Sequence, residues 1–394
     1  MKTEFGKIVI VLLLITKLFL ISCKDSKNKT ASHGSSIWPV SSLISEGIDT
    51  LVIDSINQDL TSGKYGLIDH VLVIRNGNLV IDNSYKHNYD SISQKYDTTN
   101  FQFNYDHPSW HPYYKNTDLH TLQSVTKSIT SLLVGIAVDE GFISSVDMKV
   151  MKLFNDYSIR LKDSLKDSIS LEDLLTMRGG IKWDEWSTDY DSPENSCFIL
   201  ENSKNWIEYV FTQPMDTIPG TKFVYNGGLP VLLGEVIRIK TGKRIDKWAE
   251  EKLFKPLDIK DYYWKVSPNG EIDTEGGLYL SIYDFAKIGQ LILNGGIWQG
   301  ERIISEEWVI KSTSYIAKID NNHGYGYLWW LGNYKNGTFN LLMANGFGDQ
   351  YLFIDYKNNL LTVTNGWNIH DTPEKKVRFD LPYRLARSIN KKTN

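Results

Sequence analysis

Residues 119–141 read LHTLQSVTKSITSLLVGIAVDEG, and this stretch predicts a packed helix with one polar face. Apolar residues recur at helical spacing after Ser128, and Gly141 supplies a stop. Ser124 and Lys127 lie one turn apart and share a face with Ser128. An amine at that spacing can accept or relay the hydroxyl proton, and a serine needs such help to become a nucleophile. The stretch therefore predicts Ser124 as a nucleophile with Lys127 as its partner.

The pattern Ser-x-x-Lys is weak when taken alone, because the chain contains it three times. The other two copies begin at Ser26 and Ser388. The first lies in a polar segment and the last in a charged tail, where a solvated surface explains them. Only the helix of Ser124 is strongly apolar on its opposite side, so it must be packed with its polar stripe facing something specific.

The regions on either side of this helix predict an α+β fold. Residues 71–81, VLVIRNGNLVI, are two apolar runs around Asn-Gly and predict a β-hairpin. Near the other end four short strands are expected, at 326–331, 339–344, 350–356 and 360–365, with a turn at 357–359. Helices are expected at 284–293 and 306–311. The two ends thus form a sheet, the middle forms a mostly helical lobe at roughly 140–270, and a cleft between them is a favoured ligand site.

Several blocks of sequence, in this order, resemble the serine β-lactamase and penicillin-binding-protein superfamily. The blocks are residues 119–147, 170–184, 219–234 and 276–308. The similarity is to the class C-like branch, which also holds D-alanyl-D-alanine carboxypeptidases, family VIII esterases and nylon-oligomer hydrolases. The resemblance implies a β-lactamase-like catalytic domain over residues 37–394, in which Ser124 is acylated and Lys127 aids proton transfer.

The second motif of this superfamily, Tyr-x-Asn, falls on Tyr225-Asn226-Gly227. The resemblance makes Tyr225 the general base or acid, and a phenol needs a close cation such as Lys127 to serve as a base. Here the sequence departs from the pattern, because Gly227 stands where the family usually has Asn. Asn226 is the neighbouring candidate for the missing substrate contact.

The third motif, Lys/His-x-Gly on a strand facing the serine, matches Ala344-Asn345-Gly346. Gly346 fits, but Ala344 replaces the cation that in the family helps to hold the carboxylate of β-lactams and peptides. The resemblance also implies an oxyanion hole made by the backbone N–H groups of Ser124 and Phe347. The missing cation points away from an efficient β-lactamase and toward an esterase or amidase.

Further candidates for substrate binding or chemistry are Trp186, the pair Asp184 and Glu185, and Cys197. Trp186 is the best candidate for an apolar acyl pocket, although core packing is an alternative for any of the 12 tryptophans. The adjacent carboxylates Asp184 and Glu185 are interpreted as loop charges. Cys197 has no neighbouring base or cation that would make it a nucleophile.

Composition argues against two classes of ligand. With 43 basic and 47 acidic residues the net charge is -4, which does not indicate nucleic acid. The eight histidines include His107 and His111, but prolines follow both, and no His-Glu-x-x-His occurs. We expect no metal and no other cofactor.

The first 22 residues predict an export signal. Residues 8–22, IVIVLLLITKLFLIS, follow Lys2 and Lys7 and precede Cys23. Lys17 interrupts the apolar run, which makes a single-pass membrane anchor the weaker interpretation. Residues 20–23 resemble a bacterial lipobox, in which the chain is cut before the cysteine and the cysteine is lipidated. Residues 23–36 would then be a polar tether holding the domain on a membrane of the bacterial cell envelope.

The leading hypothesis is therefore a lipid-anchored serine hydrolase that acts on an ester or amide by acylation and deacylation of Ser124. One alternative is a non-hydrolysing penicillin-binding-like sensor or scaffold. Another is a D-Ala-D-Ala carboxypeptidase acting on cell-wall peptides.

Lipidation of Cys23 can be tested by substitution. Cys23→Ser should release the protein from the membrane fraction, because the side chain that carries the lipid is lost. The measurement is the partition of the protein between soluble and membrane fractions. A variant that remains membrane-bound would contradict the lipid anchor.

Overall fold

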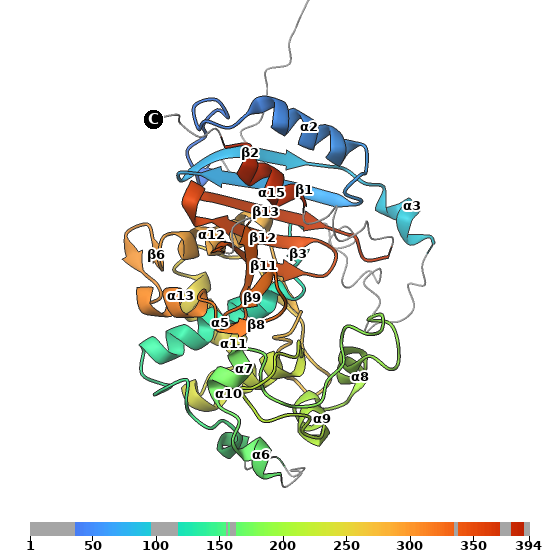
Figure 1. Ribbon diagram of the computed structural model, residues 1–394, viewed down its shortest axis with the longest axis vertical. Helices are drawn as coiled ribbons and strands as arrows, with labels where there is room; N and C mark the ends of the chain where they lie inside the picture. The colour runs from blue at the N-terminus through green and yellow to red at the C-terminus, as the bar shows by residue number, and fades with distance from the viewer. Residues whose placement is uncertain are drawn as a thin grey trace, which may run out of the picture.

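An antiparallel sheet of eight strands, in the order β2-β1-β13-β12-β11-β10-β9-β8, forms one half of the molecule (Figure 1). The computed structural model describes residues 36–95, 117–154, 157, 163–334, 338–370 and 380–389. The expected signal peptide, nearly all of the tether, and His107 with His111 lie outside these ranges. The strands of this sheet are β1 Ile68–Arg75, β2 Asn78–Ser84, β8 Ala317–Lys318, β9 His323–Tyr325, β10 Trp330–Tyr334, β11 Thr338–Gly346, β12 Gln350–Asp355 and β13 Leu360–Gly366.

The predicted hairpin is confirmed and joins the two ends of the chain. Asn76 and Gly77 form its turn with φ values of 52° and 78°, which both residue types tolerate. Strand β1 pairs with β2 on one side and with β13 on the other. The sheet is therefore built from N-terminal and C-terminal segments, as the sequence predicts.

One predicted strand was misplaced. Residues 326–329 form a turn, in which the N–H of Gly326 donates to the carbonyl of Trp329 at 2.9 Å and Leu328 has a φ of 61°. Strand β10 begins only at Trp330. A left-handed backbone at leucine is unfavourable and is not signalled by sequence, so the apolar run was interpreted as a continuous strand.

Helices cover both faces of the sheet. Helices α2 (Thr50–Thr61) and α15 (Asp380–Arg387) pack together on one face, and α5 (Val125–Asp139) and α12 (Ile282–Leu293) pack against the other. Alternate residues of β1 serve the two cores, because successive side chains of a strand point to opposite faces. Val71 contributes to the core under α2, and Leu72 to the larger central core.

The second half of the molecule is mostly helical and lies below α5 in Figure 1. Helix α10 packs against α5, α7 and α9 and links this lobe to the helix that begins after Ser124. The helices of this lobe are η2 Met151–Phe154, α6 Ser164–Asp167, α7 Leu171–Leu175, α8 Ser196–Asn202, α9 Trp206–Thr212, α10 Gly228–Thr241, α11 Ile245–Ala249 and η3 Glu250–Phe254.

A small sheet in the order β3-β5-β4 lies close to the start of α5. Strand β3 pairs with β5 through His120 opposite Leu280, and the N–H of Leu122 donates to the carbonyl of Leu278 at 2.9 Å. The pairing brings the segment before Ser124 beside the segment that precedes β5. Its strands are β3 His120–Thr121, β4 Tyr263–Trp264 and β5 Leu278–Leu280.

The remaining described elements belong to neither the large sheet, the small sheet nor the helical lobe. They are α3 Tyr89–Ser93, β6 Ile297–Trp298, β7 Glu301–Arg302, α13 Glu306–Ser312 and η4 Tyr356–Asn358. The predicted helices at 284–293 and 306–311 correspond to α12 and α13. Within the described ranges, no helix combines the length and apolarity needed to span a bilayer.

A close contact between α5 and α13 gives a test of this packing. A Cβ added at Gly135 would lie 2.4 Å from Cδ1 of the buried Trp308 indole. Gly135→Ala gains roughly 1 kcal/mol of helix propensity, but overpacking a rigid core costs about 1–3 kcal/mol. We expect a net loss of stability, measured as a lower urea midpoint. The control is Gly276→Ala, whose Cβ would meet its nearest neighbour at 3.7 Å and should change the midpoint much less.

Candidate active site

The position of Ser124 follows from a sharp turn between β3 and α5. Gln123 has a φ of 48°, and its side-chain amide donates to the Thr121 hydroxyl at 3.0 Å. A left-handed backbone costs on the order of 1 kcal/mol at a non-glycine residue, so the surroundings must hold it. The turn places Ser124 at the N-cap of α5, immediately before Val125, where the first backbone N–H groups of the helix lack partners within it.

Lys127 is brought to Ser124 as the spacing predicts. Its Nζ donates to Ser124 Oγ at 2.9 Å, and the side chain is only 1% exposed. Nζ also donates to the backbone carbonyl of Glu275 at 2.7 Å and to Glu275 Oε2 at 2.9 Å. An ammonium has three N–H donors, and these three acceptors use all of them.

Glu275 is a site residue that the sequence analysis missed. It lies just before β5, and the β3–β5 pairing brings it to Lys127 from 148 residues away along the chain. The only signal in the sequence is its place immediately before Gly276-Gly277, which begin one of the blocks that resemble the superfamily. Its carboxylate is 7% exposed at the side chain, so its charge and that of Lys127 are buried together.

The two charges shift each other's pKa in opposite directions. Burial alone would lower the pKa of Lys127, but the carboxylate of Glu275 and the electronegative groups of Tyr225 and Glu185 raise it well above its usual range. Burial alone would raise the pKa of Glu275, but Lys127 and hydrogen bonds bring it down to about 2. Lys127 is therefore an ammonium and Glu275 a carboxylate at neutral pH.

Tyr225 lies beside this pair. Lys127 Nζ is 5.1 Å from the centroid of its ring. Burial raises the pKa of Tyr225 to about 12, although the charge of Lys127 and a hydrogen bond with Ser124 act to lower it. The structure thus brings together Ser124, Lys127 and Tyr225, with the tyrosine as a neutral phenol at neutral pH.

The residues after Tyr225 form the start of α10. Asn226 is buried, and its Oδ1 accepts from the N–H of Gly228 at 2.8 Å, which gives it a local capping role. The N–H of Gly227 donates to Glu185 Oε2 at 2.8 Å. The side-chain oxygen of Asn226, which would contact a substrate, therefore already accepts a hydrogen bond from its own helix.

The interpretation of Glu185 as a loop charge was wrong. Its side chain is buried and accepts from Trp183 Nε1 at 2.8 Å and from the Tyr190 hydroxyl at 3.1 Å, besides Gly227. Burial raises its pKa, against the opposing charge of Lys127. The neighbouring Asp184 is exposed, because adjacent residues in an extended segment point in opposite directions.

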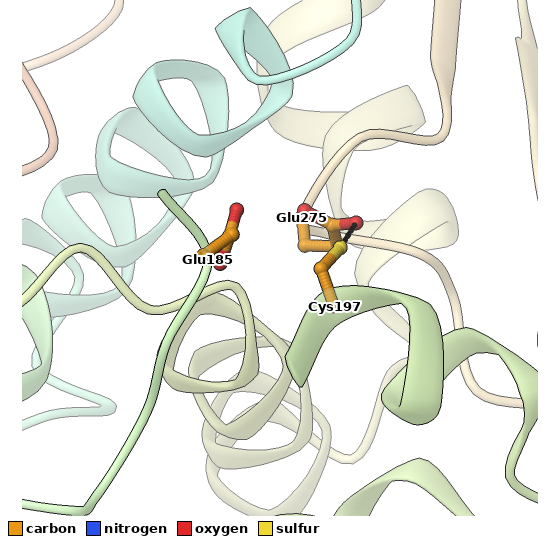
Figure 2. Close-up of side chains that lie close together, drawn as sticks. All are labelled: Glu185, Cys197 and Glu275. Carbon is orange, nitrogen blue, oxygen red and sulfur yellow. Dashed lines mark hydrogen bonds between the residues drawn. The ribbon is translucent and has the colours of Figure 1, made fainter. Parts of the chain in front are cut away.

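Among the described residues, one group of three side chains has the spacing of a metal site. Glu185, Cys197 and Glu275 offer ligand atoms within 4.8 Å of one another. Figure 2 shows Cys197, from α8, beside Glu275, with Glu185 opposite them. The chemistry does not fit a metal, because burial raises the pKa of the Cys197 thiol well above its usual range and its Sγ donates to Glu275 Oε1 at 3.1 Å. Lys127 already supplies the cation that Glu275 requires.

Aromatic side chains lie over Tyr225. Trp186 is 56% exposed and stacks on Tyr225 with ring centroids 5.2 Å apart and an 18° angle between the planes. It also stacks on Trp330 at 6.2 Å. By contrast, Trp183 and Trp329 are buried in the core. Trp186 is thus an exposed aromatic surface adjoining the Ser124 site.

The end of β11 meets the turn before Ser124. A Cβ at Gly346 would lie 2.3 Å from the carbonyl oxygen of Leu122, so only glycine allows this approach. Phe347 follows, and its ring lies 5.3 Å from that of Tyr190. Two residues before Gly346, the methyl group of Ala344 is fully buried in the central core.

Comparison with known proteins shows the family of the chain. The profile of the Beta-lactamase family matches residues 68–375. The chain is 26% identical over 277 residues to the 6-aminohexanoate-dimer hydrolase of Paenarthrobacter ureafaciens, covering 65% of this chain and 68% of the hydrolase. It is 28% identical over 198 residues to the lovastatin esterase of Penicillium rubens, covering 45% of this chain and less than half, 47%, of the esterase.

Solved structures show the same fold. A family VIII carboxylesterase superposes with a TM-score of 0.62 at 18% identity, over 87% of this chain and 97% of that chain. A putative 6-aminohexanoate-dimer hydrolase from Bacillus anthracis superposes with a TM-score of 0.64 at 17% identity, over 89% of this chain and 88% of that chain. The chain therefore belongs to the Beta-lactamase family and is a serine hydrolase with a β-lactamase-like fold.

Proposed function

We propose that this hydrolase cleaves neutral esters or amides through an acyl-enzyme on Ser124. The observation that carries the proposal is the distance of 2.9 Å between Lys127 Nζ and Ser124 Oγ, with the phenol ring of Tyr225 beside the same ammonium. A nucleophile beside a general base whose ionised form is stabilised by an ammonium is an arrangement suited to covalent catalysis.

In the proposed acylation, Ser124 Oγ attacks the carbonyl carbon and its proton passes to Tyr225 in the ionised form. The nearby ammonium of Lys127 stabilises that phenolate. The backbone N–H groups of Ser124 and Phe347 bind the oxyanion of the tetrahedral intermediate. Tyr225 returns the proton to the leaving alcohol or amine. Water then attacks the acyl-enzyme by the same steps in reverse.

The proton states define the expected pH dependence. A general base acts only when it has lost its proton, and the pKa of Tyr225 is about 12. The fraction of ionised Tyr225 therefore grows as pH rises through the neutral and mildly alkaline range. We expect kcat/KM to increase with pH over that range.

The substrate side of the proposal rests on charge and surface chemistry. Ala344 supplies no cation for a substrate carboxylate, and Trp186 offers an apolar stacking surface beside Tyr225. Two of the curated relatives are named as a 6-aminohexanoate-dimer hydrolase and a lovastatin esterase, so amide and ester substrates both occur among similar proteins. The absence of a cation at Ala344 favours an esterase or amidase over a carboxypeptidase, whose peptide substrates end in a carboxylate.

We also propose that Cys23 anchors the enzyme to a membrane of the cell envelope. What supports this is the lipobox-like stretch at residues 20–23 and the polar segment after it. The substrate would then be met outside the cytoplasm.

Substitution of the proposed pair tests the mechanism. Ser124→Ala and Lys127→Ala should each reduce hydrolysis of a short-chain p-nitrophenyl ester by ~10³-fold or more, and the double variant should be no worse, because residues acting as one unit lose activity non-additively. The matched control is Ser26→Ala, which removes the serine of another Ser-x-x-Lys and should leave the rate unchanged. Wild type that does not release p-nitrophenol would favour the sensor or scaffold.

A comparison of substrates tests the charge argument. A charge-assisted hydrogen bond contributes about 1.5–3 kcal/mol, so its absence should cost an anionic substrate roughly 10- to 150-fold. The measurement is kcat/KM of the wild type for a neutral short acyl ester and for benzylpenicillin. We expect the ester to be turned over much faster than benzylpenicillin. A preference for benzylpenicillin would overturn the proposed substrate class.

A further inference from the structure

Glu275 is the main partner of the lysine beside the nucleophile. It supplies two of the three acceptors for Lys127 Nζ, one from its backbone carbonyl at 2.7 Å and one from its side chain at 2.9 Å. The backbone acceptor would remain whatever residue stood at 275. Only the carboxylate acceptor depends on residue 275 being a glutamate. Its other oxygen, Oε1, accepts a hydrogen bond from Cys197 Sγ at 3.1 Å.

The carboxylate occupies the space in front of Gly227. A Cβ built at Gly227 would lie 3.1 Å from Glu275 Oε2 and 3.3 Å from Glu185 Oε2. Both are tighter than ordinary contacts. Neither oxygen can retreat easily, because Lys127 binds the first and the Trp183 indole N–H binds the second. A side chain at position 227 and the carboxylate at 275 therefore compete for one volume beside Lys127.

We infer that Glu275 is a positioning residue that holds Lys127 from the place a side chain at position 227 would otherwise fill. Glycine at 227 and glutamate at 275 are then a matched pair, because the side chain absent at 227 leaves room for the carboxylate at 275. The inference rests on the proposed function, because it assigns Glu275 a role in the reaction at Ser124.

The charge of Glu275 also distinguishes it from a neutral partner. A carboxylate fixes Lys127 as an ammonium, whereas an amide would hold it by a hydrogen bond alone. The titratable groups that face Lys127 or Glu275 come from the loop before α8, from α8 itself, from the segment before α10, from β9 and from the β4–β5 connection. They are Glu185, Tyr190, Cys197, Glu201, Tyr225, Tyr325 and Asp273, and Lys265 lies in turn near Glu201 and Asp273.

A double-variant cycle tests whether the two positions are matched. Gly227→Asn alone should lower kcat/KM for the p-nitrophenyl ester by about 10-fold or more, because it displaces a hydrogen-bonded carboxylate from an ammonium. Glu275→Ala alone should lower it by a similar factor. The double variant Gly227→Asn/Glu275→Ala should have a kcat/KM about 10-fold higher than that of the less active single variant. The reason is that the Asn amide can take the vacated place beside Lys127.

Gly227→Ala with Glu275→Ala is the matched control. It fills the same space without an amide oxygen and should not recover activity. Equal recovery by the Ala and Asn combinations would overturn the inference, because space filling alone would then explain it. The inference would also be overturned if the loss of kcat/KM in Gly227→Asn/Glu275→Ala equalled the product of the two single losses. Thermal melts of every variant identify any that fail to fold, and if Glu275→Ala unfolds, the role of the carboxylate is tested by the pH profile of Glu275→Gln.

Glu275→Gln adds a readout that a merely structural residue would not move. Removing the negative charge lowers the pKa of Lys127 and of Tyr225, since Glu275 raises both. The rising limb of the pH profile of kcat/KM should therefore move to lower pH. An unchanged limb would overturn the inference.

Wild type and Ser124→Ala are measured in the same series, so that the two proposals can fail separately. If wild type is inactive on esters, or Ser124→Ala is as active as wild type, the proposed function is wrong. If wild type depends on Ser124 but the 227/275 cycle shows no recovery, only the inference fails.

Discussion

The buried charge of Lys127 is the constraint on which the site depends. An ammonium that is almost wholly removed from water is costly unless hydrogen bonds and an opposite charge compensate it. Breaking a buried ion pair by removing one partner typically costs about 3–5 kcal/mol, because the remaining charge is left uncompensated. Glu275 meets this requirement, and the geometry of the nucleophile follows from how Lys127 is held.

The topology meets the requirement by joining distant segments. Pairing of β3 with β5 places Glu275 beside the first turn of α5, and the close approach of Gly346 to the Leu122 carbonyl brings the end of β11 to the same turn. Helix α5 lies between the eight-stranded sheet and the helical lobe and contacts both β11 and α10. Ser124 is therefore held from three sides by elements that are themselves packed in cores.

The site carries an excess of carboxylate near its reacting groups. Glu185 and Glu275 both lie against Lys127, and Glu201 is linked to Glu275 by a hydrogen bond that requires one of the two to be protonated. Burial raises the pKa of Glu201 well above its usual range, so Glu201 carries that proton. An acidic interior of this kind, together with the apolar Ala344, gives a substrate carboxylate no favourable partner.

The sequence by itself determined the α+β fold, the 71–81 hairpin and the pairing of Ser124 with Lys127, because these depend on local periodicity and turn chemistry. It also indicated the family, through blocks that keep their order along the chain. Only the tertiary structure decided the role of Glu275, the burial of Glu185 and the stacking of Trp186 on Tyr225. Each of these is a contact between segments far apart in sequence. A glutamate carries no local sign of whether solvent or an ammonium will surround it, since strand pairing and helix packing alone settle which charges are buried together.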